Sequence, residues 1–492
     1  MTAEVPPRQR RSLASNIGSL LASQSLTWVF ATIVAWTVPR YLGATELGQW
    51  RLATSVAAIM VVLASFGTDT YLTIEVAKQR GTARSLVRSV VAMRLALFAL
   101  LVPFTGVLLA IGPYDWQATK VVALVAAGAA IGLVATSYTS TLHGLQEMGK
   151  SALTTVINRA VGLAATLTVL LLGGRVVALA ISSILTWVLG LWLVRRAFAK
   201  VAPTTTDGAA RGRALIAASL PFLLADATLV VYQQIDTIVI SLVTDEATIG
   251  WYAAADTLFG SSLFVPVVLM TALLPVISEM HARDPERVTR ELTRAFDSLL
   301  LFAVPIGMGT IVISKSFISV LYGDAFAESA DVLAVFGVVT ILTCLTILLG
   351  RVAIATGRTK FWTVLMLTAI VVSVPLDVVL VPWADRRFDN GAIGGALAYV
   401  VTEGFMLTVG ILFLAPQLVN RTTGARVLRC AVAGGCMLAV GWPLRDRLFL
   451  ISGTVSVVVY VIVVVLLRTL QDHERAVLGG YWSKVRMRLG RA

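Results

Sequence analysis

The chain has 492 residues and a formal net charge of +13; 57% of its residues are hydrophobic and 14% are charged. These charged side chains are too few for a soluble globule of this size, so the composition excludes that class and indicates a lipid bilayer as the solvent. The three cysteines, Cys344, Cys430 and Cys436, lack metal-ligand spacing, which argues against a zinc site or a disulfide framework.

Fourteen apolar stretches are long enough to cross a bilayer, for which a helix needs about 20 residues. The chain is therefore predicted to be an all-α polytopic membrane protein. In chain order the spans are 13–38, 49–76, 87–111, 119–142, 151–173, 176–194, 214–243, 250–277, 296–320, 330–350, 361–382, 391–415, 427–443 and 448–467.

Lysine and arginine are distributed unevenly between the two sides of these spans. One side holds 29 of the 40 Lys and Arg residues and the other holds 9, while Arg94 and Arg159 lie inside spans. This positive-inside bias predicts that both termini are cytoplasmic. It also accounts for the net charge without a nucleic-acid partner, and the basic tail is suited to anionic membrane lipids.

Weak internal similarity divides the chain into two halves. Glu46–Trp50 opens the second span much as Thr248–Tyr252 opens the eighth, and an offset of six spans is typical of carriers built from parallel repeats. The predicted segments are a basic cytoplasmic N-terminus (1–12), an N-lobe (13–194), a cytoplasmic linker (195–213), a C-lobe (214–415), two further spans (427–467) and a basic cytoplasmic tail (468–492).

Several short motifs, taken in their order and spacing, resemble one family of carriers. They include Arg40-Tyr41-Leu42-Gly43, Leu47-Gly48-Gln49-Trp50, Phe66-Gly67-Thr68-Asp69-Thr70, Leu321-Tyr322-Gly323, Ala355-Thr356-Gly357-Arg358 and Gly391-Ala392-Ile393-Gly394-Gly395. The chain resembles the oligosaccharide flippases, the polysaccharide-transporter branch of the multidrug/oligosaccharidyl-lipid/polysaccharide exporter superfamily. It departs from their pattern at Ile74 and Gln234, where the family often has basic residues.

The resemblance implies a V-shaped protein with two six-helix lobes and two C-terminal helices. It implies a flippase, not an enzyme, that moves a polyprenyl-diphosphate-linked oligosaccharide to the outer leaflet of the bacterial cytoplasmic membrane for surface polysaccharide or lipopolysaccharide biosynthesis. The expected partners are this lipid, membrane lipids and glycan polymerase or chain-length machinery. No metal site or cofactor is expected beyond coupling to H⁺ or Na⁺.

Other functions match the sequence less well. Many enzymes that act on lipid-linked sugars need a sizeable soluble loop, and the outer loops here are short and offer no paired acids or histidine constellation. An ATP-driven pump would need a G-x-x-x-x-G-K-[ST] loop, which the sequence lacks. The alternatives left open are a lipid II flippase and a multidrug or cation antiporter of the same superfamily.

A polar stripe follows the fourth span. Thr136, Ser140, His143 and Glu147 recur at i, i+4, i+7 and i+11 and so share one face of a continuous helix. Such a stripe is costly against lipid, so we expect it to line a substrate cavity. The alternative is that the hydroxyl groups bond a neighbouring helix while His143 and Glu147 lie at the cytoplasmic interface.

Arginines inside spans are candidates for holding the diphosphate, because a guanidinium fork fits phosphate oxygens and stays charged. Arg94 and Arg159 lie about 10 to 12 Å from the cytoplasmic ends of their spans, and Asn158 accompanies Arg159. The alternative is that both side chains snorkel to the interface. Arg351 lies at the half-repeat equivalent of His143 and predicts a matching cavity wall, or else an interfacial cation.

The seventh span contains the candidates for ion coupling. Asp226 and Asp236 are carboxylates inside a carrier, where they can bind a coupling proton or sodium ion, or else pair with the arginines. Pro221, near the start of this span, is the best candidate for a hinge, because proline weakens the helical hydrogen-bond ladder.

Overall fold

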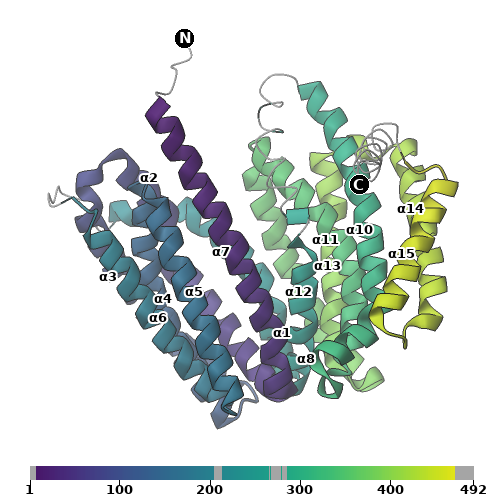
Figure 1. The fold of residues 1–492 in the computed structure, drawn as a ribbon, viewed down its shortest axis with the longest axis horizontal. Coiled ribbons are helices and arrows are strands. Elements are labelled where there is room, and N and C mark those ends of the chain that lie inside the picture. Colours follow the sequence, from purple (N-terminus) through teal and green to yellow (C-terminus); the bar gives the residue numbers. More distant parts are fainter. Residues whose placement is uncertain are drawn as a thin grey trace, which may run out of the picture. The chain divides into compact units, whose positions relative to one another are not determined.

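The computed structural model describes residues 7–203, 213–264, 266–267, 277, 279 and 285–470. Over these residues the protein is helical, with no strand, which confirms the predicted all-α class (Figure 1). Most of the predicted tail, the centre of the predicted linker and residues 1–6 lie outside the described residues.

Fourteen α-helices are described here, and they are joined by short loops and 3-10 turns. They are α1 (Pro7–Ser65), α2 (Thr68–Lys78), α3 (Ala83–Ile111), α4 (Trp116–Gly144), α5 (Met148–Leu171), α6 (Val176–Ala199), α7 (Arg213–Val243), α8 (Glu246–Ser262), α10 (Pro285–Tyr322), α11 (Ser329–Ala355), α12 (Thr359–Phe388), α13 (Gly391–Leu414), α14 (Arg421–Gly441) and α15 (Phe449–Leu466).

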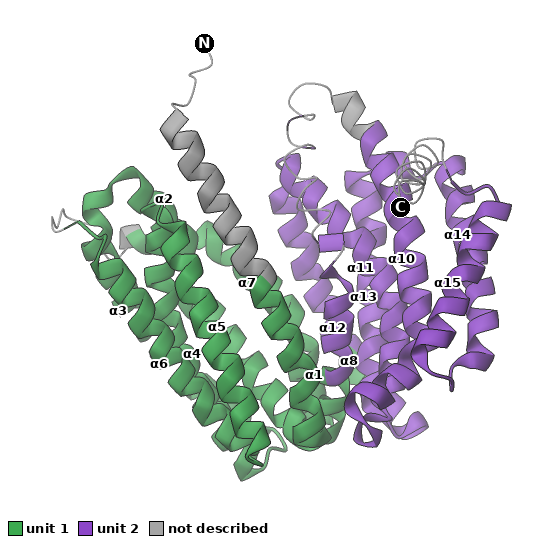
Figure 2. Cartoon of the chain, in the orientation of Figure 1, with its two compact units in different colours: residues 1–253, 377–382 green, residues 254–376, 383–492 purple. Residues whose placement is uncertain are grey.

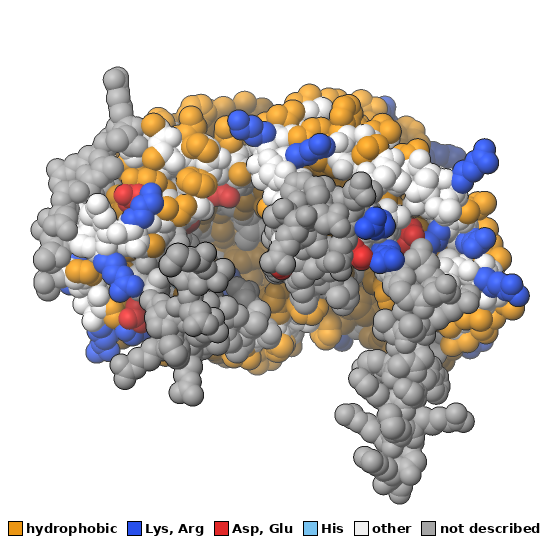
Figure 3. Space-filling view, turned by 90° about the horizontal axis from the view of Figure 1, so that it is seen from above, with side chains coloured by type: hydrophobic (Ala, Val, Ile, Leu, Met, Phe, Trp, Pro, Cys, Tyr) orange, Lys and Arg blue, Asp and Glu red, His pale blue; other side chains and the backbone are white. Residues whose placement is uncertain are grey.

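Twelve helical segments among the described residues are long and apolar enough to cross a membrane, so the chain is a multi-pass membrane protein. The first segment, Leu26–Lys78, covers the predicted span 49–76 and the later part of the predicted span 13–38, and the predicted span 250–277 includes residues outside the described ones. The count of fourteen therefore stays a prediction. Figure 3 shows the protein from above relative to Figure 1. Lys and Arg side chains are scattered over this end, and hydrophobic side chains form much of its edge.

Two backbone breaks shape the first of these segments. Gly43, at φ 75° and ψ 176°, interrupts α1, and Phe66 (φ 51°) and Gly67 (φ 67°) separate α1 from α2. Gly67 also permits a close approach to α7, because a Cβ there would lie 2.4 Å from the Leu223 backbone nitrogen and 2.7 Å from the Ser219 carbonyl oxygen. The second break therefore places the start of α2 against α7.

The chain forms two compact units (Figure 2). Unit 1 comprises residues 1–253 and 377–382, and unit 2 comprises 254–376 and 383–492. Unit 1 has a core that includes Leu72, Val90 and Leu142, and unit 2 has one that includes Leu348 and Met437. Helix α7, which was expected to open the C-lobe, packs within unit 1. The lobe boundaries were inferred from sequence repeats, not packing, and they stay predictions.

Within unit 1, α1 and the start of α8 cross at a reciprocal backbone contact. A Cβ on Gly48 would lie 1.8 Å from the Glu246 carbonyl oxygen, and one on Gly250 would lie 1.9 Å from the Ala44 carbonyl oxygen. Each glycine thus meets the residue four positions before the other, as in a local two-fold arrangement. The two similar sequence motifs that open the second and eighth spans are therefore in direct contact at these glycines.

Within unit 2, the last two helices are fixed to α10 by polar groups in an apolar core. Arg426 of α14 lies 3.6 Å from Asp297 of α10, and both side chains are 6% exposed. The Tyr460 hydroxyl of α15 donates to the Leu301 carbonyl oxygen at 2.9 Å.

Candidate functional site

A polar cluster inside unit 1 surrounds Arg94. The residue lies eleven positions after Ala83, the first residue of α3, and so about 16 Å along the helix axis. Its side chain is fully buried, the largest to be so among the described residues. A guanidinium at this depth stays charged and must be compensated by protein groups.

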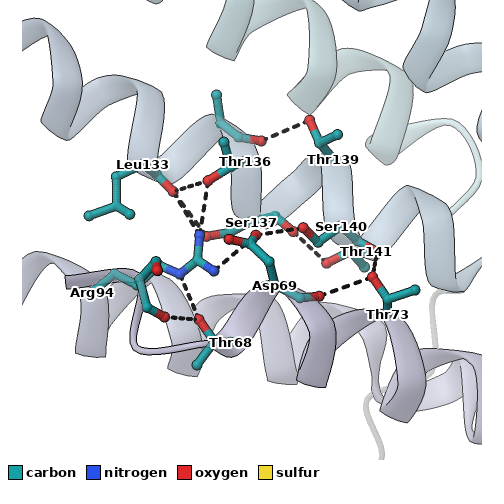
Figure 4. Close-up of polar contacts among 12 residues, drawn as sticks. Thr68, Asp69, Thr73, Arg94, Leu133, Thr136, Ser137, Thr139, Ser140 and Thr141 are labelled. Atoms are coloured by element: carbon teal, nitrogen blue, oxygen red, sulfur yellow. Dashed lines mark hydrogen bonds and ion pairs between the residues drawn. The ribbon is translucent and has the colours of Figure 1, made fainter. Parts of the chain in front are cut away.

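Four groups from two helices, α2 and α4, surround this guanidinium (Figure 4). Its Nε donates to the Thr68 hydroxyl at 2.8 Å, and its Nη1 donates to the Thr136 hydroxyl at 3.0 Å. The same Nη1 donates to the Leu133 carbonyl oxygen at 3.1 Å. Finally, Nη2 lies 3.0 Å from Oδ1 of Asp69, which forms the ion pair.

Asp69 is the least buried member of this pair. Its side chain is 41% exposed, whereas that of Arg94 is 0% exposed. The Ser140 hydroxyl donates to the same Oδ1 at 2.6 Å, and the Thr73 hydroxyl donates to the Asp69 carbonyl oxygen at 3.0 Å and to that of Ser140 at 3.1 Å. Asp69 is therefore held in one orientation at the edge of the cluster.

The structure does not bring Arg94 to a surface that a diphosphate can reach, contrary to the sequence-based expectation. The reason is the break at Phe66–Gly67, which turns α2 so that Thr68 and Asp69 cover the guanidinium. Thr136 and Ser140 likewise serve this cluster, which agrees with the alternative that the hydroxyl groups of the stripe bond neighbouring groups.

The polar stripe of the fourth span ends earlier than expected. The His143 ring Nε2 lies 2.9 Å from the Ser151 hydroxyl of α5. Helix α4 ends at Gly144, and Gln146 has φ 64°, so Glu147 lies in the following turn and not on the helical stripe. Glu147 instead pairs with Lys150 at 3.1 Å.

Arg159 has a different environment from Arg94. It is exposed on α5, and none of the ion pairs found in the described part of the chain involves it. Asn158 faces α6, where a Cβ added to Gly190 would lie 2.9 Å from its Nδ2. In unit 2, Arg351 of α11 is half-buried. Of Arg94 and Arg159, the two arginines predicted to hold the diphosphate, Arg159 is therefore the exposed one.

Helix α7 contributes further polar groups to unit 1. Asp226 is exposed and lies within electrostatic range of Asp69, whereas Asp236 is 8% exposed and accepts a bond from the Tyr252 hydroxyl at 3.3 Å. Gln234 accepts from the Ser55 hydroxyl at 2.8 Å. Arg51, which the sequence reasoning missed, donates to the Thr237 hydroxyl at 3.4 Å.

Pro221 lies inside α7, which continues through it, and it belongs to the stretch that faces Gly67. Its role as a hinge stays a prediction. Asp69 was also missed from sequence, although the Gly67 that precedes its helix was a visible signal, because glycine marks helix breaks.

Several solved transporter structures share the fold of this chain. In structure, it is similar to the lipid II flippase MurJ in an inward closed conformation, with a TM-score of 0.72, 15% identity, and coverage of 90% of this chain and 98% of that chain. It is also similar to an inward-facing multidrug resistance MATE transporter of the MOP superfamily (TM-score 0.61, 13% identity, 80% and 98% coverage). The eukaryotic MATE transporter AtDTX14 gives a TM-score of 0.57 at 14% identity, with 87% and 99% coverage.

Sequence comparison assigns the family. No protein among the curated proteins matches the chain. The MatE family model matches residues 221–379, and the model described as polysaccharide biosynthesis protein matches residues 13–281, which is more than half of the chain. The chain therefore belongs to the polysaccharide biosynthesis protein family and is a membrane transporter of the multidrug/oligosaccharidyl-lipid/polysaccharide exporter superfamily.

Proposed function

We propose that the protein moves a polyprenyl-diphosphate-linked oligosaccharide from the inner to the outer leaflet of the bacterial cytoplasmic membrane. The observation that supports this most is the family match over residues 13–281, which spans the helices that carry the polar cluster. A head group with many hydroxyls and a charged diphosphate cannot cross hydrocarbon unaided at a useful rate. Alternating access of a polar surface inside unit 1 to the two leaflets would remove that barrier.

In this proposal Arg159 binds the diphosphate. Its guanidinium is exposed and has no ion-pair partner among the described residues, so two of its N–H groups can bond phosphate oxygens in parallel. Asp226, which is exposed on α7, is the better candidate for a coupling proton or sodium ion; Asp236 is largely buried. The protein transports the lipid without hydrolysing it or transferring its sugar.

The proposal places both termini in the cytoplasm and the protein in the same membrane as the polymerase and chain-length machinery that would use its product. The charge bias of the loops supports this orientation. Substrate selection would then rest on the sugar groups nearest the diphosphate, since these enter the bilayer together with it.

The direct test is the leaflet location of the labelled lipid-linked sugar. Deletion of the protein should strand the lipid in the inner leaflet and stop glycan export. In reconstituted vesicles, Arg159→Ala should slow flipping about 10- to 100-fold, and Arg159→Lys should recover only part of the rate because a point charge replaces the fork. Arg429→Ala removes an exposed arginine of α14 in unit 2 and serves as the control. A normal flipping rate for Arg159→Ala would exclude the assigned role.

A second candidate is lipid II as the cargo. The structural similarity to the lipid II flippase MurJ extends over 98% of that chain, and lipid II also carries sugars on a polyprenyl diphosphate. Expression in cells depleted of their own lipid II flippase decides between the two: rescue of growth supports lipid II, whereas failure with normal membrane levels supports the oligosaccharide. Accumulation of a cationic drug in the deletion strain, with glycan export intact, would instead indicate a multidrug exporter.

A further inference from the structure

We infer that Asp69 accepts hydrogen bonds from the sugar hydroxyls of the cargo and that Arg94 is the residue that positions it. This inference rests on the proposed function, because it assigns the sugar-contacting group of the same carrier. It begins from the unequal exposure of the ion pair, in which Asp69 is 41% exposed and Arg94 is 0% exposed.

One oxygen of the Asp69 carboxylate is occupied, and the other has no partner among the described residues. Oδ1 lies 3.0 Å from Arg94 Nη2 and accepts from the Ser140 hydroxyl at 2.6 Å. These two contacts fix the rotation of the side chain, and the Thr73 hydroxyl fixes its carbonyl oxygen. Oδ2 forms no hydrogen bond or ion pair with the described residues, so it can accept a hydroxyl from a ligand at the exposed edge.

Arg94 cannot be the ligand-contacting group in this arrangement. Its Nε and Nη1 are used by Thr68, Thr136 and the Leu133 carbonyl oxygen, and Nη2 is used by Asp69. A guanidinium held by two helices, α2 and α4, acts as a rigid support, as the groups that surround a binding residue often do. The backbone break at Gly67 places α2 against this guanidinium. Asp69 and Arg94, which lie in different predicted spans, therefore form one ion pair.

The chemistry favours hydroxyl groups over a cation. Arg94 compensates the charge of Asp69, so the pair as a whole is neutral and a poor site for a cation, while the carboxylate oxygen still accepts hydrogen bonds. No group of three or more His, Cys, Asp or Glu residues suited to a metal ion exists in the described part of the chain. Neutral sugar hydroxyls gain fully from an ionised acceptor, because charge-assisted bonds are about twice as strong as neutral ones.

A second acceptor borders the same surface. Ser219, Leu223 and Asp226 recur at i, i+4 and i+7, so they share one face of α7, and Gly67 packs against the first two of them. Asp226 therefore belongs to the face of α7 that packs beside the start of α2.

The test compares the binding of two lipids to the detergent-purified, full-length protein. One is polyprenyl diphosphate carrying the oligosaccharide, and the other is bare polyprenyl diphosphate. The main variant is Asp69→Asn/Arg94→Gln, which removes both charges together so that no buried guanidinium is left unpaired. The matched control is Asp297→Asn/Arg426→Gln, the same change in the buried pair of unit 2.

We expect the Asp69/Arg94 double variant to lose about 10- to 100-fold of its affinity for the glycosylated lipid and to bind the bare lipid as before. The control should leave both affinities unchanged. Arg94→Lys should give an intermediate ratio of the two affinities, because a single ammonium pairs with Asp69 but cannot also hold Thr68 and Thr136. A merely structural role would lower the melting temperature without moving this ratio.

Three outcomes would overturn the inference. The first is an equal loss of affinity for both lipids, and the second is no loss at all. The third is that lipid binding depends on sodium concentration in the wild-type protein but not in the double variant. Such a result would identify Asp69 as a cation ligand. Failure of the wild-type protein to bind either lipid would instead refute the proposed function on which the inference rests.

Discussion

The crossing of α1 and α8 gives the most quantitative stability prediction. Replacement of Gly48 by alanine places a Cβ 1.8 Å from the Glu246 carbonyl oxygen. Ordinary contact needs at least about 3.4 Å, so the two helices must separate by about 1.6 Å. Overpacking of this kind costs about 1–3 kcal/mol, while alanine gains about 1 kcal/mol over glycine in helix propensity. The net loss is therefore about 0–2 kcal/mol.

Gly404 of α13 provides the matched control, because no atom lies within 4 Å of the position that its Cβ would occupy. Gly404→Ala should therefore be neutral or stabilising by up to about 1 kcal/mol. The two variants should differ by about 2 kcal/mol in the free energy of unfolding, measured by denaturant titration in mixed micelles. Equal stability of Gly48→Ala and Gly404→Ala would refute the close backbone crossing.

The double variant Gly48→Ala/Gly250→Ala tests whether the two contacts share one displacement. Gly250→Ala alone meets the Ala44 carbonyl oxygen at 1.9 Å and should cost as much as Gly48→Ala. Because a single separation of the helices relieves both clashes, the second substitution should add little to the first. Additive losses would show that the helices yield at each glycine separately.

The polar contacts and the charge bias of the loops can also be tested. Arg94→Gln leaves the Asp69 carboxylate without its cation and should lower the folded yield, and the added Asp69→Asn should restore most of it, as judged by size-exclusion profiles. Burial raises the pKa of Glu246 above its usual value of 4.5. The native state therefore binds more protons than the unfolded state, and its stability should fall as the pH rises from 4.5 through the raised pKa. Glu246→Gln should abolish this pH dependence of the melting temperature. Finally, cysteines at Asp385 and Lys200, both exposed, should react with an impermeant reagent in intact cells only at position 385; labelling at position 200 would contradict the predicted topology.

The sequence predicts the elements well because hydrophobic length and charge bias report directly on the bilayer. Helix α4, for example, covers residues 116–144 where a span was expected at 119–142. The ends of helices are harder to predict, because a single residue with positive φ can end a helix. Gln146, which has positive φ and precedes Glu147, is an example. A regular period cannot reveal such a residue, so the predicted stripe extended one turn too far.

The polar cluster was only half predictable. Arg94 stood out because an arginine inside an apolar stretch is unusual. Its partner Asp69 did not, because 25 residues separate the two in sequence and Asp69 lies after a helix break. Pairing of this kind depends on how α2 is turned by Phe66 and Gly67, which is a tertiary property. The same limit applies to Arg159, whose exposure depends on which helices cover α5.

The break at Phe66–Gly67 links the fold to the proposed chemistry. On a continuous helix, Asp69 would follow the direction set by α1, but two residues with positive φ redirect the chain before Thr68. Left-handed conformations are costly outside glycine, so Phe66 is held there by its surroundings. Gly67, in contact with α7, and Arg94, in contact with Thr68 and Asp69, provide that restraint from two sides. The buried Arg94 guanidinium thus stabilises the bend at Phe66–Gly67. This bend holds the partly exposed Asp69 carboxylate in one position.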